Sequence, residues 1–303
     1  MKIQMVARTD VGRVREINED YYGNFLEAKL AVLCDGMGGH KAGSQASRLA
    51  VSTIRYMYLY LEKDKQLKIA NDLDEQLIKI ASPLVSSVRL ANRHIFNRAC
   101  KDPKYKGMGT TVSAISFIDE LACICHVGDS RVYRLRDDTF ELLTEDHSWL
   151  NELIQDKEIK AEEVSKFEKR NVITRALGLA PTVKIDIKIE PVKVEDTFLL
   201  CSDGLTSGVT DDEIKNVIAS PKFTLVEMAD ELIKLANQKD GSDNITVSVI
   251  KVIEADEKKA PISEPVSATL KSEDTTTSEI ENKILKRQFY NSTFSNKIYD
   301  FAE

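Results

Sequence analysis

Apolar residues recur along this chain with two periods, and each period predicts a different kind of element. Continuous or alternating apolar runs are typical of β-strands, and they lie at 2–8, 30–34, 110–118, 121–127, 131–136, 140–143, 183–190, 196–202 and 244–252. Helical spacing after the 30–34 run predicts a helix whose buried face comprises Ala46, Leu49, Ala50, Thr53, Ile54, Met57 and Leu61. A second helical stretch covers roughly 73–100. The pair Ser82–Pro83 predicts a break in it, because serine often caps a helix and proline suits the first turn.

The order of these elements indicates the fold class. The strands between residues 110 and 143 are joined by short polar turns, which cannot hold crossover helices and so predict an antiparallel meander. Two capping boxes then mark helix starts, one with Thr210 and Glu213 and the other with Thr224 and Glu227. Strands alternating with helix pairs in this way favour an antiparallel sandwich flanked by helices.

Three segments differ from this pattern. Residues of about 145–175 are charged and contain few core candidates, so we expect a surface flap there. Residues 254–279 are rich in Ser, Thr, Lys, Glu and Pro, a composition that predicts a disordered linker. The tail, 280–303, regains apolar residues such as Phe289 and Phe301, and both a frayed end and a docking segment remain open for it.

Composition and charge narrow the class of protein. The 303 residues are 42% hydrophobic and 30% charged, which is typical of a soluble protein with one large domain and an appendage. The net charge of −7 argues against a general binder of nucleic acid or anionic membrane. No stretch has the length of a membrane span and no signal peptide is visible, so we expect a cytoplasmic protein. The five cysteines form no CxxC pair, which predicts reduced thiols, mostly in the core.

Four acidic motifs carry the candidate chemistry. They read AVLCDGMGGH around Asp35, CICHVGDSR around Asp129, FLLCSDGL around Asp203 and GSDNITVSVI around Asp243. A carboxylate at the end of a buried strand is costly unless a cation meets it, and an adjacent glycine lets the backbone approach a ligand closely. A single Asp-Gly pair would indicate a tight turn. Four in matching contexts predict oxygen ligands for Mg²⁺ or Mn²⁺.

A charged segment near the N-terminus adds a possible anion site. The sequence TDVGRVREINED contains Arg15, Glu19 and Asp20. An arginine offers a bidentate fork to a phosphate dianion, whereas a solvated charged turn explains the same residues equally well. Two metal ions about 3.5–4 Å apart, bridged by a carboxylate and a hydroxide, are a recognised hydrolytic device.

Taken in order, the motifs resemble those of a known family. GRVREINED, VLCDGMGGHKAG, GMGTT, HVGDSRVYRL, LTEDHS, VITRALG, LLCSDGL and GSDNITV follow one another across residues 3–252. This series resembles the metal-dependent Ser/Thr protein phosphatases of type 2C, and the bacterial branch most closely. The resemblance implies a catalytic domain over 1–253 with an α+β fold, a four-layer αββα sandwich of two antiparallel β-sheets flanked by helix pairs. It does not extend to the tail.

The resemblance also implies a role for each candidate residue. Asp35 matches the aspartate that bridges both metal ions, and Gly36 the glycine whose carbonyl binds the second ion. Asp203 and Asp243 match ligands of the first ion, and Asp129 matches a ligand of a third, weaker ion shared with Asp203. Arg15 matches the phosphate-binding arginine. Glu19 and Asp20 match acids that hold metal-bound waters.

The implied activity is hydrolysis of phosphoserine and phosphothreonine in proteins by a dinuclear Mn²⁺ or Mg²⁺ centre, with a bridging hydroxide as nucleophile. A monomer that reverses a Ser/Thr kinase is expected. The chain has Met37 where eukaryotic members often carry a histidine proposed as general acid, so another group must protonate the leaving oxygen. His40 and His126 are interpreted as loop-packing residues, and His94 and His147 show no ligand pattern.

Two other functional hypotheses compete with this one. A catalytically silent module could keep the fold and bind phosphoproteins, and loss of Asp35, Asp203 or Asp243 would mark it. All three are present. A third hypothesis places part of the function in the tail, as a dock for a kinase or scaffold around Phe289 to Phe301.

Overall fold

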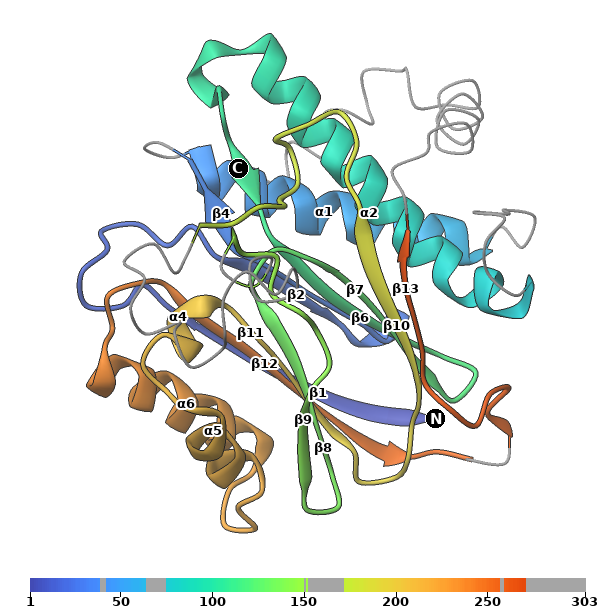
Figure 1. The fold of residues 1–303 in the computed structure, drawn as a ribbon. Helices are drawn as coiled ribbons and strands as arrows, with labels where there is room; N and C mark the ends of the chain where they lie inside the picture. Colours follow the sequence, from blue (N-terminus) through green and yellow to red (C-terminus); the bar gives the residue numbers. More distant parts are fainter. Residues whose placement is uncertain (39–41, 64–74, 150, 152–171, 257–258, 271–303) are drawn as a thin grey trace.

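The chain folds into four layers, with two β-sheets in the middle and a helix pair on each outer side (Figure 1). The structure, a computed structural model, describes residues 1–38, 42–63, 75–149, 151, 172–256 and 259–270. Every strand pair in the two large sheets is antiparallel. The predicted αββα sandwich is therefore confirmed.

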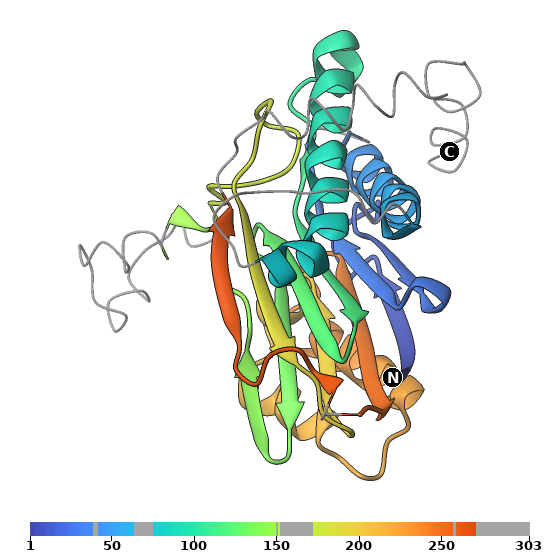
Figure 2. The ribbon, with the colours of Figure 1, turned by 90° about the vertical axis from the view of Figure 1, so that its right-hand side faces the viewer.

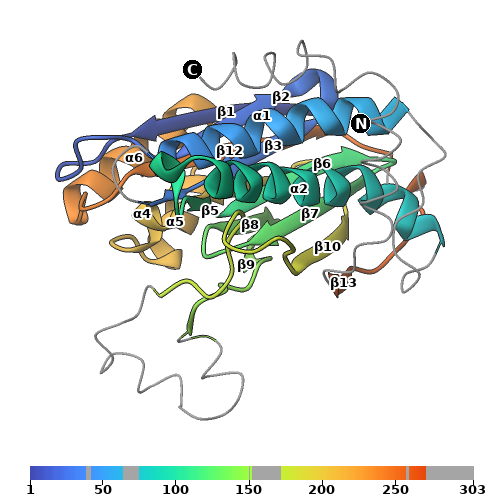
Figure 3. The ribbon, with the colours of Figure 1, turned by 90° about the horizontal axis from the view of Figure 1, so that it is seen from above.

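The larger sheet has six strands in the order β13-β10-β7-β6-β3-β2. Their bounds are β13 Val266–Leu270, β10 Ile185–Pro191, β7 Leu121–Val127, β6 Val112–Ile118, β3 Leu30–Cys34 and β2 Tyr21–Phe25. Two long helices cover its outer face, namely α1 Ala42–Lys63 and α2 Glu75–Lys101 (Figure 3). The face predicted for α1 is buried from Ala46 to Leu61, as the helical spacing requires.

The smaller sheet has five strands in the order β1-β12-β11-β8-β9. Their bounds are β1 Lys2–Asp10, β12 Ile245–Glu254, β11 Thr197–Cys201, β8 Arg131–Arg136 and β9 Thr139–Leu142. Its outer face is covered by α5 Asp211–Ile218 and α6 Leu225–Lys239, and the one-turn helix α4 Asp203–Thr206 follows β11. Both predicted capping boxes are confirmed at the starts of α5 and α6. The remaining short elements are β4 Gly36–Met37, β5 Gly109–Thr110, η1 Leu26–Ala28 and η2 Pro103–Tyr105.

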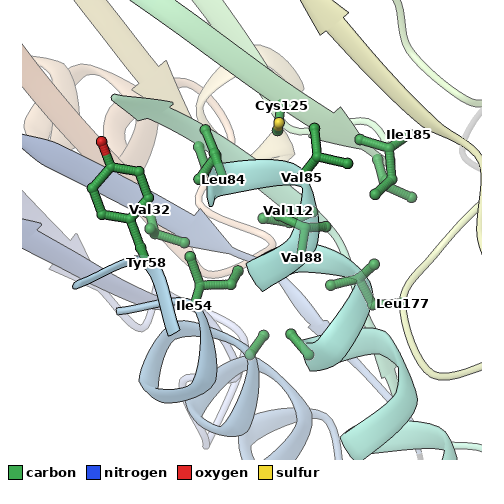
Figure 4. Packing of buried hydrophobic residues seen from close by; sticks show 14 of the residues in the cluster. Val32, Ile54, Tyr58, Leu84, Val85, Val88, Val112, Cys125, Leu177 and Ile185 are labelled. Carbon is green, nitrogen blue, oxygen red and sulfur yellow. The ribbon is translucent and has the colours of Figure 1, made fainter. Parts of the chain in front are cut away.

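Three buried clusters fill the three spaces between the layers. Strand β3 shows how one run serves two of them, because Ala31 and Leu33 face the other sheet whereas Leu30 and Val32 face the helices. Figure 4 shows Val32 beside Ile54 and Tyr58 of α1 and beside Leu84 of α2. A strand that is buried on both faces is apolar throughout, which explains the continuous LAVLC sequence of β3.

Two predictions about the first half of the chain are wrong. The expected meander over 110–143 is split, since β6 and β7 pair in the larger sheet while β8 and β9 pair in the smaller one. The chain changes sheets at Gly128, whose φ of +116° re-aims the backbone. The expected break at Pro83 is also absent, because α2 continues through it and its face around Leu84 and Val88 is fixed by packing.

The segment predicted as a linker contains a strand. Residues 266–270 form β13 and pair with β10, so the prediction of disorder over 254–279 is wrong for this part. Its alternating burial shows why a composition rich in Ser and Thr can still add an edge strand. Most of the predicted flap, 150 and 152–171, and the whole tail, 280–303, lie outside the described residues.

Candidate metal centre

The four acidic motifs meet at one end of the sandwich, the end that carries β4 and α4 in Figure 1. Asp35 follows β3, Asp129 lies two residues after the end of β7, Asp203 lies two residues after the end of β11, and Asp243 lies two residues before β12. Cys201 at the end of β11 pairs with Val247 near the start of β12. Antiparallel pairing therefore gathers motifs that are far apart in the sequence.

Asp35 is fixed through its backbone by the GMGTT segment. Its carbonyl accepts hydrogen bonds from the Thr110 hydroxyl and from the Thr111 amide, both at 2.8 Å. Its own amide donates to the Thr111 hydroxyl at 2.9 Å. Gly36 follows in a space that admits no side chain, since a Cβ there would lie 2.2 Å from the Gly43 carbonyl oxygen. The backbone of this pair is thus rigidly held, which leaves the Asp35 carboxyl to respond to a ligand.

Burial and mutual repulsion raise the pKa values of the acids in this cluster. Burial raises the pKa of Asp35 well above its ordinary value, and the charges of Asp20, Asp203 and Asp129 raise it further. Burial likewise raises the pKa of Asp129 to about 7, with the charge of Asp203 adding to the effect. Burial also raises the pKa of Asp203. Negative charge is therefore costly at this end of the sandwich unless cations enter it.

Several carboxylate oxygens are buried without a partner. One oxygen each of Asp203, Asp129, Asp20 and Glu19 is buried and has no hydrogen-bond partner. Buried polar atoms in native proteins are nearly always satisfied. These oxygens therefore indicate positions where a ligand completes the structure.

Arg15 reaches the same cluster from the N-terminal loop. Its Nη2 donates to Oδ2 of Asp243 at 2.8 Å, while about half of its side chain stays exposed. The hydrogen bond and the charge of Asp243 raise the pKa of Arg15. The structure thus places the predicted phosphate-binding arginine at the rim of the acidic cluster, on a partner that is itself a predicted metal ligand.

Glu19 and Asp20 lie behind the cluster. Burial raises the pKa of Asp20 to about 7, although hydrogen bonds from Thr246 and Ser202 oppose the effect. The Ser202 hydroxyl donates to Asp20 at 2.8 Å. Burial also raises the pKa of Glu19, whose carboxylate accepts from the backbone of Ser44 and Gly43. Both acids are therefore held in place with one oxygen left for a further partner.

The other singled-out residues have structural contacts. The side chain of His126 bonds the Ser113 hydroxyl and the Glu145 carbonyl, and burial lowers its pKa to about 3, which agrees with a packing role. Burial lowers the pKa of His94 to about 4. Met37 lies in β4 beside Asp35, and His40 lies outside the described residues. All five cysteines are free thiols, and four of them are buried as predicted.

These motifs match a family model. The model for protein phosphatase 2C matches residues 13–249. The chain belongs to the protein phosphatase 2C family. It is similar to the serine/threonine phosphatase stp of Listeria innocua, with 37% identity over 246 residues that cover 80% of this chain and 93% of that protein.

Solved structures of relatives agree with this assignment. The serine/threonine phosphatase PstP/Ppp of Mycobacterium tuberculosis matches with a TM-score of 0.73 and 33% identity, over 84% of this chain and 100% of that chain. A structure of the PstP catalytic domain in complex with two manganese ions has a TM-score of 0.69 and 33% identity, over 83% and 99%. Our type 2C protein is thus a metal-dependent serine/threonine phosphatase, and phosphoproteins are its substrates.

The donor set of this type 2C phosphatase fits the ions that the family uses. Hard divalent ions prefer carboxylate and carbonyl oxygens, and the unpartnered oxygens of Asp129 and Asp203 are such donors. In the described part of the chain, no three His, Cys, Asp or Glu side chains already meet as a metal cluster. Suitable donor oxygens are thus present in the cluster. For several of them to hold one ion, carboxylates would have to turn, including that of Asp243, which now pairs with Arg15.

Sequence reasoning missed the residues that hold this type 2C site together. Asn244 is central, because its amide donates to the carbonyls of Val11 and Ile17 and its oxygen accepts from the Glu19 amide. It thereby ties the Arg15 loop to the Asp243 motif. Its place directly after Asp243 was the available signal. Thr111 and Ser202 lie within the motifs GMGTT and LLCSDGL, but their partners Asp35 and Asp20 are distant in sequence and only the structure identifies them.

No helix in the described ranges is both long and apolar enough to cross a membrane.

Proposed function

We propose that this phosphatase hydrolyses phosphoserine and phosphothreonine at a dinuclear Mn²⁺ or Mg²⁺ centre. The observation that carries the proposal is the group of buried, unpartnered carboxylate oxygens at the end of the sandwich, next to acids whose pKa values are raised by burial and by one another's charge. When bound, the two ions supply a hydroxide nucleophile at neutral pH and neutralise charge on the phosphoryl group.

Five residues of the chain would hold the ions. The Asp35 carboxylate and the Gly36 carbonyl would serve the two-metal centre together with Asp203 and Asp243. Asp129, together with Asp203, would hold a weaker third ion. The Thr110 and Thr111 contacts support these roles, because they orient the Asp35–Gly36 backbone before any ligand enters.

Arg15 binds the phosphate of the substrate. Its guanidinium is exposed enough to meet a bulky phosphoprotein, and its contact with Asp243 keeps it beside the metal ligands. The guanidinium fork would bind two phosphate oxygens once it is released from Asp243. Glu19 and Asp20, each with one unpartnered buried oxygen, would orient waters at the centre.

The wider setting of the activity follows from the family and the fold. We infer a catalytic domain over 1–253 that acts as a cytoplasmic monomer and opposes a cognate Ser/Thr kinase. The manganese-bound relative PstP supports the choice of metal, and the low share of basic residues relative to acidic ones, 42 against 49, supports a protein rather than a nucleic-acid substrate.

Phosphate release from a phosphothreonine peptide tests this function. We expect turnover with Mn²⁺, loss of turnover with EDTA, and recovery when Mn²⁺ is added in excess. Turnover that persists after chelation contradicts the dinuclear mechanism. A folded, manganese-loaded protein that binds the peptide without releasing phosphate favours the catalytically silent module instead.

Replacing Arg15 by alanine should lower kcat/KM for the phosphopeptide by about 10–100-fold, since a hydrogen bond to a charged group is worth about 1.5–3 kcal/mol. The kcat/KM of Arg15→Lys should lie between those of the unmodified enzyme and Arg15→Ala, because lysine keeps the charge but lacks the planar pair of donors. Arg13→Ala is a matched control, as Arg13 is exposed in the same loop. Steady-state kinetics that show equal effects for Arg13→Ala and Arg15→Ala would contradict the assignment.

A further inference from the structure

Strand β13 is the last strand in the described part of the chain. It begins at Val266, beyond the end of the family match at residue 249. It forms the outer edge of the six-stranded sheet beside β10 (Figure 2). In this pairing Thr269 lies directly opposite Asp186, and directly opposite residues in an antiparallel pair share one face of the sheet.

Asp186 is the centre of a polar cluster on that face. Its Oδ2 lies 2.8 Å from Nε2 of His147, and its Oδ1 lies 3.3 Å from Nη1 of Arg175. Burial raises the pKa of Asp186, but hydrogen bonds from His147 and Thr269 outweigh it and lower the pKa to about 2. Asp186 and Thr269 also line the same cavity of about 420 Å³. The edge strand thus places Thr269 against the Asp186 carboxylate, directly opposite it in the strand pairing and beside the same cavity.

His147 extends these contacts to Gly128. The Gly128 amide donates to Nδ1 of His147 at 3.0 Å, so Nδ1 is the acceptor and the proton on Nε2 faces Asp186. The backbone amide of His147 donates to the Gly128 carbonyl at 2.7 Å. Both backbone polar groups of Gly128 are therefore held by this one residue, whose side chain is almost fully buried.

Gly128 in turn determines where Asp129 lies. Its φ is +116°, and a Cβ there would lie 2.6 Å from Cβ of Thr111. Only glycine can therefore occupy this position while the backbone stays this close to Thr111. Asp129 follows directly, with one carboxylate oxygen buried and unpartnered. A shift of Gly128 moves that oxygen.

We propose that β13 positions the Asp129 carboxylate for its metal ion, through the series of contacts from Thr269 to Asp186, His147 and Gly128. The inference rests on the proposed role of Asp129 as a ligand of the third ion. Thr269, Asp186 and His147 are positioning residues, since none of them is a proposed ligand of a metal ion or of the phosphate. A strand beyond the residues that the family model matches thereby tunes one metal site.

The test uses full-length variants on β13. Thr269→Val removes the hydroxyl and keeps the shape of the side chain, whereas Thr269→Ser retains the hydroxyl. Ala268→Pro disrupts the pairing of the whole strand. Ser267→Ala is the matched control, because Ser267 faces the same side opposite Lys188. Mn²⁺ titration by calorimetry reports the affinity of each ion, and amide hydrogen exchange of the metal-free protein reports the protection of Gly128 and Asp129.

We expect Thr269→Val and Ala268→Pro to lower the affinity of the most weakly bound Mn²⁺ ion by about 3–10-fold. This is less than the 10–100-fold effect of residues that contact a metal ligand directly. The two tighter ions should keep their affinity, Thr269→Ser should restore the weak one, and exchange at Gly128 and Asp129 should accelerate. In an Asp129→Asn background the same changes should add nothing to the metal titration.

Three outcomes separate this inference from the proposed function. Equal titrations and equal exchange for Thr269→Val, Ala268→Pro and Ser267→Ala overturn the inference while the dinuclear function stands. Equal weakening of all ions overturns it too, because that result indicates general destabilisation. Absence of Mn²⁺ binding by the unmodified protein contradicts the proposed function, and in that case unchanged exchange at Gly128 in Ala268→Pro still overturns the coupling to β13.

Discussion

Asp35→Asn is expected to lower kcat for a phosphothreonine peptide by about 10³-fold or more. Ions at such a centre supply several kcal/mol of transition-state stabilisation, and each 1.36 kcal/mol is a factor of ten in rate. The amide keeps the shape of the carboxylate but cannot bridge two cations by charge. The same variant should also bind Mn²⁺ much more weakly in a calorimetric titration.

Stability separates this effect from misfolding. The Asp35 carboxyl is buried among acids that raise its pKa, so replacing it with a neutral amide relieves repulsion. The metal-free Asp35→Asn protein should therefore unfold at a temperature no lower than the unmodified one at pH 8. Asp138→Asn is the charge-matched control, since Asp138 is exposed at the far end of the β8–β9 hairpin. An Asp35→Asn enzyme with a normal rate would contradict the bridging role.

Manganese should stabilise this phosphatase far more at pH 8 than at pH 5. Asp20 and Asp129 have pKa values of about 7 in the folded protein against an ordinary value of 3.8. Between these values the folded state holds more protons than the unfolded state, so the free energy of unfolding falls as the pH rises. Metal-free protein is therefore expected to melt at a lower temperature at pH 8 than at pH 5.

Cations reverse this trend because they replace protons at the same oxygens. At a concentration of Mn²⁺ one hundred times its dissociation constant, one ion adds about 2.7 kcal/mol, which corresponds to roughly 5–10 °C for a domain of this size. Differential scanning fluorimetry with EDTA and with Mn²⁺ across pH 5–8 measures both effects. A melting temperature of the EDTA-treated protein that rises steadily from pH 5 to pH 8 would contradict the expected direction of the pH dependence.

Much of the fold could be predicted from the sequence because the signals for individual strands and helices are local. The continuous apolar run of β3 and the helical spacing of α1 predicted both elements, and the capping boxes at Thr210 and Thr224 predicted where α5 and α6 begin. The break at Pro83 was wrong because packing of α2 on the larger sheet outweighs the lost hydrogen bond. Strand β13 was missed because it lies in a polar segment and pairs with β10, which is far away in the sequence.

The candidate site divides in the same way. The sequence by itself determined the family and the acidic motifs around Asp35, Asp129, Asp203 and Asp243, because the chemistry of a metal ligand is written in residue type and in neighbouring glycine. The tertiary structure alone decided which sheet each motif enters, how Asn244 and Thr111 hold the Arg15 loop and the Asp35 backbone, and how β13 contacts the His147–Gly128 region through Asp186. These contacts join residues more than a dozen positions apart, and their formation depends on strand pairing and burial that no local pattern encodes.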